Sequence, residues 1–126
     1  MDELVKTWLE EYQEAIRSGK PEDALPLFAE NAVVFGTNVN WSRYVPEYAK
    51  KQGEPVFGGS TNFEITQTLS TVQMDESAYV AILWKDKVVI KGQTKDRYGR
   101  ATFVLQIQDE TFVAIHSHVS EFPEAN

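Results

Sequence analysis

The second half of the sequence alternates between apolar and polar residues over four consecutive segments. They cover residues 63–74, 77–92, 99–108 and 111–122, and short polar stretches separate them. Successive side chains of a β-strand point to opposite faces of the sheet, so this period of two predicts four strands. Because the connections are short, we expect the strands to pair in sequence order as an antiparallel meander.

The N-terminal part of the chain has the spacing of helices. Apolar residues recur every three or four positions from Glu3 to Ser18, and Gly19 and Pro21 are typical of the end of such a helix. A second short helix is expected over residues 21–29. Pro26 lies too far inside it for a regular helix, so we expect this helix to be kinked or broken.

The region between the helices and the meander is mixed. Residues 31–38, with the sequence NAVVFGTN, are rich in β-branched residues and predict a strand, whereas residues 41–53 predict a third helix and residues 54–62 a loop. The fold class expected is therefore α+β, with three N-terminal helices packed on one face of a curved antiparallel sheet. We expect the burial of Trp8, Leu27, Phe28, Phe103 and Leu105 between the two layers.

Length and charge exclude several classes of protein. The chain has 126 residues, which fits a single domain over residues 1–126. It has a net charge of −7 and no cysteine, which argues against nucleic-acid binding and excludes disulfides and thiolate metal sites. No apolar run approaches the length that spans a membrane, and the acidic N-terminus is unlike a secretory signal. We therefore expect a soluble, cytoplasmic protein that binds neither nucleic acid nor membrane.

Two stretches carry a family resemblance. DALPLFAENAVVFGT early in the chain and GRATFVLQIQDETFVAIHSHVS near its end resemble the SnoaL-like branch of the nuclear transport factor 2-like superfamily. The resemblance covers nearly the whole chain. It implies a cone-shaped sheet around an internal pocket, closed by three helices, and a homodimer formed through the open face of the sheet. The same scaffold serves enzymes and non-catalytic modules, so the resemblance does not fix the chemistry.

The two histidines of the chain, His116 and His118, are separated by one residue. A regular strand places them on one face together with Phe112 and Ala114, and the resemblance suggests that this face looks into the cone. Two imidazoles with no third ligand at a fixed spacing are a weak metal motif, so we expect no metal and no cofactor. His116 is then either a structural residue or a pocket group that can transfer a proton near neutral pH.

The best-understood enzymes of this superfamily are the ketosteroid isomerases, which combine an aspartate base with an oxyanion hole. Alignment of the chain with them by its landmarks places Tyr12 at the position of the oxyanion tyrosine, but Gly36 and Phe103 occupy the positions of the base and of the hydrogen-bonding acid. Steroid isomerisation by that mechanism is therefore not expected. Tyr12 is either a catalytic group or a core residue whose hydroxyl reaches a partner.

Aromatic residues on the predicted third helix suggest the wall of a ligand site. Trp41 and Tyr44 would supply apolar surface, and the amide of Asn38 would orient a ligand. We therefore expect a small organic ligand inside the cone, bound by Tyr12, Asn38, Trp41, Tyr44, Phe103, His116 and His118. The alternative is a lyase or isomerase that uses His116 as general acid or base. Arg97 and Arg100 flank a predicted hairpin and are expected to be exposed.

A second resemblance suggests assembly. The ending HSHVSEFP looks like the close of the association domain of calcium/calmodulin-dependent protein kinase II, which builds rings and catalyses nothing. A homodimer through the outer face of the sheet remains the first expectation, because that face would expose an apolar patch too wide for a monomer. The patch is expected to include Val104, Val113, Ile115 and Val119.

Overall fold

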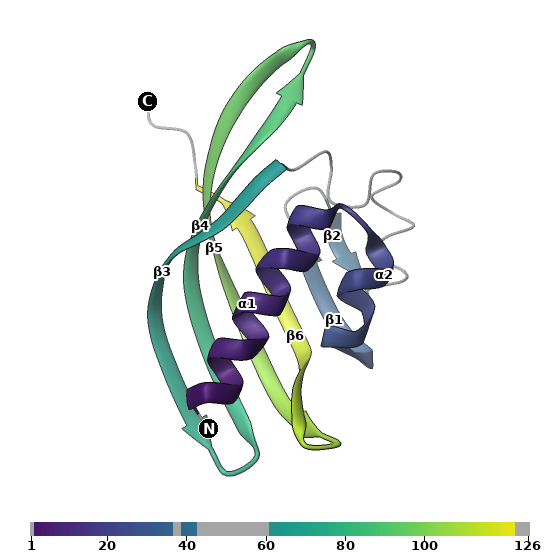
Figure 1. The fold of residues 1–126 in the computed structure, drawn as a ribbon, viewed down its shortest axis with the longest axis vertical. Coiled ribbons are helices and arrows are strands. Elements are labelled where there is room, and N and C mark those ends of the chain that lie inside the picture. Colours follow the sequence, from purple (N-terminus) through teal and green to yellow (C-terminus); the bar gives the residue numbers. More distant parts are fainter. Residues whose placement is uncertain (1, 37–38, 43–60, 123–126) are drawn as a thin grey trace.

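A computed structural model describes residues 2–36, 39–42 and 61–122 of the chain. Figure 1 shows helix α1 (Asp2–Ser18) lying along the concave face of a strongly curved sheet. Within the described residues, no helix is long and apolar enough to cross a membrane. The sheet has six strands in the order β2-β1-β6-β5-β4-β3. Their bounds are β1 Phe28–Gly36, β2 Val39–Ser42, β3 Thr61–Met74, β4 Ser77–Ile90, β5 Gln93–Gln108 and β6 Thr111–Glu121.

The second helix breaks near Pro26, as predicted. Helix α2 covers only Pro21–Ala24 and is followed by a 3-10 turn, η1, over Leu25–Leu27. Pro26 lacks the N–H group that an α-helix needs at this position, so the chain continues in a tighter turn. β1 then starts at Phe28, three residues before the predicted start of the strand.

The prediction that a third helix starts at Trp41 is wrong. Trp41 and Ser42 belong to β2, which pairs antiparallel with β1 through Val34 and Ser42. The rest of that predicted helix lies outside the described residues. A strand as short as β2 has too few positions to display a period of two, which is why the sequence pattern missed it. The described part of the chain thus contains two α-helices and one 3-10 turn.

The sheet is mixed, not purely antiparallel. Strands β3 to β6 form the predicted antiparallel meander, but β1 lies parallel to β6, with Val33 opposite His116 and Phe35 opposite His118. A pair of parallel strands joins segments that are far apart in sequence, so no local sequence pattern predicts it. The expectation of an antiparallel sheet was therefore wrong at β1.

The β4–β5 hairpin is longer than predicted. Lys91 and Gly92 form its turn with φ angles of 53° and 79°, which is typical of a two-residue type I′ turn. Residues 93–98, expected to be a loop, belong to β5. In Figure 1 this hairpin extends well beyond the body of the sheet, above the C-terminal end of α1.

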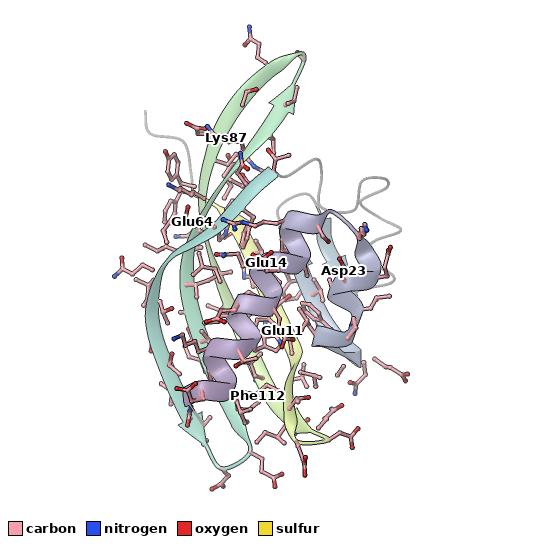
Figure 2. The ribbon with its side chains drawn as sticks, viewed as in Figure 1. Glu11, Glu14, Asp23, Glu64, Lys87 and Phe112 are labelled. Carbon is pink, nitrogen blue, oxygen red and sulfur yellow. The ribbon has the colours of Figure 1, made fainter. Side chains whose placement is uncertain are left out.

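The core lies between α1 and the concave face of the sheet. Trp8, Leu27, Phe103 and Leu105 are buried there, as predicted, and Phe28 is partly buried against the same cluster. The polar face of α1, which carries Glu11 and Glu14, points away from the sheet (Figure 2). The helix thus buries one apolar stripe and leaves its charges in water.

Phe103 is fully buried, with 0% of its surface exposed. Replacing it with alanine removes a large ring from a packed site and leaves a cavity, so Phe103→Ala should lower the free energy of unfolding by about 3–5 kcal/mol. Chemical denaturation measures this loss. Phe122→Ala, at a site with 38% exposure, is the matched control and should cost far less. A loss at residue 103 no larger than that of the control would contradict the assigned core.

Candidate functional site

A β-bulge in β6 determines which way the two histidines point. Leu105 of β5 lies opposite Ala114, but the next residue of β5, Val104, lies opposite His116. Ile115 is therefore the extra residue, and it turns every later side chain of β6 to the other face. Phe112 and Ala114 belong to the buried core cluster.

The prediction that the histidines look into the cone is therefore wrong. His116 and His118 lie opposite Val104 and Thr102 on the convex face, the face turned away from α1. Ser117, opposite the buried Phe103, points to the concave face instead. Val119, expected in the outer apolar patch, packs partly buried against the core cluster.

The two imidazoles flank one phenyl ring on the convex face. The centroid of the Phe35 ring lies 5.5 Å from the His116 ring and 5.8 Å from the His118 ring, both edge to face. Burial lowers the pKa of His116 below its usual value, and the charge of His118 lowers it further, against a hydrogen bond to the Val33 backbone. His116 therefore favours its neutral form. No group of three metal-binding side chains occurs among the described residues.

The middle of the concave face is filled by aromatic rings. Tyr12 stacks on Trp8 with 5.2 Å between ring centroids, and Phe103 contacts both rings at 4.9 Å. Tyr12 and Phe103 are therefore core residues. They do not form a common pocket with His116, which lies on the opposite face. Of the other predicted ligand-binding residues, Trp41 lies in β2, while Asn38 and Tyr44 lie outside the described residues.

A second group of residues continues the concave face towards the C-terminal end of α1. We call it the Trp84 cluster. The Phe63 ring lies 5.8 Å from the Tyr12 ring on one side and 5.8 Å from the Trp84 ring on the other. The guanidinium of Arg97 lies over the Trp84 ring at 5.8 Å. The members of the cluster are Phe63, Trp84, Asp86, Arg97 and Gly99.

A buried ion pair orients the arginine. Arg97 donates two hydrogen bonds to the Asp86 carboxylate, from Nε at 3.0 Å and from Nη2 at 2.8 Å. The side chain of Asp86 is 2% exposed and that of Arg97 is 14% exposed. This two-point contact fixes the plane of the guanidinium above the indole ring. The expectation that Arg97 is exposed was wrong, whereas Arg100 is exposed as predicted.

Trp84 has a buried hydrogen-bond donor that finds no partner among the described residues. Its indole Nε1 is inaccessible to water and forms no hydrogen bond within the part of the chain that the structure describes. The other buried tryptophan of the core differs, because Trp8 Nε1 donates to the Leu27 carbonyl at 3.0 Å. A buried donor without an acceptor is costly, and such groups are often found where a ligand or water binds.

Gly99 allows the close packing of this ring. A Cβ atom at position 99 would collide with the Trp84 ring and with the Ser120 carbonyl oxygen. Only glycine therefore lets β5 approach the indole so closely. The ring is thus held between the backbone of β5 and the Arg97 guanidinium.

Sequence analysis missed this cluster, although one signal was available. In β4, buried side chains alternate with exposed or half-buried ones. The buried ones, which all lie on the same face, are Val80, Ile82, Trp84, Asp86 and Val88. A carboxylate in phase with four apolar residues must find a cation, because an unpaired buried charge is very costly. The phase of Asp86 therefore predicts an arginine or lysine opposite it, and Arg97 occupies that place.

Two grooves that the described residues line border the concave face. One, of about 600 Å³, runs between α1 and β3 and is lined by apolar residues such as Leu9 and Ile65, together with charged Lys6 and Glu10. The other, of about 280 Å³, lies where the β4–β5 hairpin leaves the sheet and includes Glu64, Asp86 and Lys87. Figure 2 places Glu64 and Lys87 at that end, far from Phe112. The smaller groove thus reaches the Trp84 cluster at Asp86.

The family comparison covers almost the entire chain. The model of the SnoaL-like domain matches residues 5–124. No curated protein matches the chain.

Solved structures share the fold at low sequence identity. A proposed calcium/calmodulin-dependent protein kinase II association domain from Xanthomonas campestris is 22% identical, with a TM-score of 0.81 over 96% of this chain and 87% of that one. A nuclear transport factor 2-like protein from Salmonella enterica is 16% identical, with a TM-score of 0.80 over 97% and 91%. A ketosteroid isomerase-like protein from Erwinia carotovora is 12% identical, with a TM-score of 0.78 over 96% and 95%.

The Asp86–Arg97 pair should be important for stability. Asp86→Asn removes the negative charge and leaves a nearly buried guanidinium, so the free energy of unfolding should fall by about 3–5 kcal/mol. The neighbouring pair Lys87–Asp96, at 2.7 Å with both side chains about half exposed, provides the control. Asp96→Asn should cause a much smaller loss because water solvates the remaining lysine. Equal losses in the two variants, measured by urea denaturation, would argue against a special role for the buried pair.

Proposed function

The chain belongs to the SnoaL-like domain family, and from this premise we propose that it binds a small organic ligand on the concave face, at the Trp84 cluster. The observation that carries the proposal is the buried Nε1 donor of Trp84, which has no hydrogen-bond partner in residues 2–36, 39–42 and 61–122. Because this donor is inaccessible to water in the structure, the Trp84 ring would have to shift towards the groove at Asp86 when the ligand binds. A ligand oxygen that then accepts the hydrogen bond would remove the cost of the unsatisfied group. Phe63 and Trp84 are 4% and 3% exposed, so their rings would supply apolar walls for the rest of the ligand only after this shift.

The chemistry of the cluster favours binding over catalysis. Its one carboxylate, Asp86, already accepts two hydrogen bonds from Arg97. His116, the candidate acid or base of the alternative lyase or isomerase, lies opposite Val104 on the convex face. A general acid or base must come within hydrogen-bond reach of its substrate. We therefore assign no catalytic residue and propose a binding module.

A ligand screen by NMR tests this site. The chain has three tryptophans, and each indole N–H gives its own signal. Aromatic and alicyclic ketones and carboxylic acids that bind at the cluster should shift the Trp84 signal, which is identified by its loss in Trp84→Phe. The Trp8 signal is an internal control, because its donor already pairs with Leu27. Trp84→Phe should weaken binding by roughly 1–3 kcal/mol. Binders that leave the Trp84 signal unmoved and keep their affinity for Trp84→Phe would place the site elsewhere.

We propose further that two copies of the chain associate through their convex faces. The register of the strands aligns two rows of side chains across five strands of this face, which we call the convex rows. The only acidic or basic side chains in these two rows are the two histidines. The first row is Val72, Tyr79, Val104, His116 and Val33, and the second is Ser70, Ala81, Thr102, His118 and Phe35.

The composition of the convex rows supports an interface. The chain carries 31 charged residues in total, 12 basic and 19 acidic, yet none lies in either row. Depletion of charge and exposure of aromatic and apolar side chains are typical of the centre of an interface. Val72 and Tyr79 are 47% and 36% exposed, and Met74, beside them on β3, is 58% exposed. A second copy would remove this apolar surface from water.

Sedimentation at micromolar concentration tests the association. Val104→Asp places a charge in the middle of the first convex row and should convert the dimer to a 14.3 kDa monomer. Val89→Asp makes the same change on the β4–β5 hairpin, where Val89 is 66% exposed, and should leave the dimer intact. A wild-type monomer would contradict the proposal. A ring of ten or more copies would favour the alternative that the chain is a non-catalytic assembly module similar to the kinase association domains.

A further inference from the structure

We propose that His116 and His118 make the association of two copies sensitive to protons, so that the convex faces associate when both imidazoles are neutral and separate when they are protonated. This inference rests on the convex-face homodimer proposed above. The histidines would then regulate assembly, and would act neither as metal ligands nor as groups that line the cone.

The position of the histidines within the patch is the first argument. Both lie on β6, which has β1 on one side and β5 on the other. His116 is the fourth of five residues in the first convex row, and His118 holds the same place in the second. A copy that covers the rows must therefore cover both imidazoles. Neither histidine lies at the edge of the sheet, where it could remain in water.

The second argument is that, among the described residues, no acidic side chain faces the two histidines from a neighbouring strand. On β5 the residues opposite the histidines are Val104 and Thr102, and on β1 they are Val33 and Phe35. The sequence of β2, the next strand, is VNWS and holds no charge. The nearest charged position on β5 is Arg100, which lies opposite Ser120 and is therefore diagonal to His118. It is a cation, so it opposes protonation.

The energetic consequence is that a protonated pair is poorly tolerated in a covered face. Taking an unpaired cation out of water is costly, and the usual response is loss of the proton. In the separate chain, burial already lowers the pKa of His116, and the charge of His118 lowers it further. A second copy would add burial and bring two more imidazoles near. Association then requires the neutral forms and releases any bound protons, so it weakens as the pH falls through the range in which imidazoles titrate.

The net charge of the chain predicts the opposite trend. At neutral pH each copy carries a charge of −7, and the isoelectric point is near 4.8. Lowering the pH towards that value reduces the repulsion between copies, which favours association. If net charge dominated, the dimer would be tighter at pH 5.5 than at pH 7.5. The sign of the pH dependence therefore separates a histidine effect from a general charge effect.

Sedimentation equilibrium at pH 7.5 and pH 5.5, at equal ionic strength, measures this sign. The dissociation constant of the wild-type dimer should rise by about tenfold or more at pH 5.5, because each proton that must be released changes it about tenfold per pH unit below the pKa. The His116→Gln, His118→Gln double variant keeps polar, neutral side chains. Its dissociation constant should stay constant or fall at pH 5.5.

A calorimetric measurement on the wild-type chain alone provides a second readout. Dilution of the dimer at pH 6.5 in two buffers of different ionisation enthalpy gives the number of protons exchanged, and we expect protons to be taken up on dissociation. A dimer with equal or tighter association at pH 5.5, or with no proton uptake, would overturn the histidine switch and leave the homodimer standing. A wild-type chain that is monomeric at both pH values would overturn the homodimer itself, and the switch with it.

Discussion

A single extra residue in β6, Ile115, decides which side chains of the central strand enter the core. Before it, Phe112 and Ala114 face α1; after it, Ser117 and Val119 do so. Without the bulge the strand would present two imidazoles to the Trp8, Tyr12 and Phe103 rings. Because polar rings without partners are costly in such a core, the bulge is a condition for the packing of α1 on the sheet. The bulge also places both histidines on the convex face, where they are the only acidic or basic side chains in the two rows that cross five strands.

The concave face is organised as a continuous line of rings. Trp8, Tyr12, Phe63 and Trp84 each contact the next, and the Arg97 guanidinium covers the last of them. The line begins beside α1 and ends at the ion pair with Asp86. Its filled middle gives stability, while its far end keeps an unsatisfied donor. The far end also contains the buried Asp86–Arg97 pair, so substitutions at the proposed binding site are expected to affect stability as well.

The sequence predicted those features whose physical cause is local. The period of two located β3 to β6, the helical period located α1, and the missing N–H of Pro26 located the break after α2. The parallel contact between β1 and β6 and the bulge at Ile115 depend on residues that meet only in the folded chain, and no short-range pattern encodes them. The histidines were thus assigned to the wrong face because an unbroken period was assumed. The Asp86–Arg97 pair could have been predicted from the sequence, because a carboxylate in phase with buried apolar residues requires a cation as its partner.

The pairing of β1 with β6 has a consequence for biosynthesis. Val33 becomes the neighbour of His116, so β1 leaves the ribosome long before its partner exists. At typical elongation rates of about 5–20 residues per second, the delay is on the order of ten seconds. During that time the edge of β1 that later pairs with β6 presents unpaired main-chain groups to solvent or to chaperones. The pairing of β1 with β6 is therefore expected late in synthesis. Slow formation of such contacts between distant segments is typical of folds with high contact order.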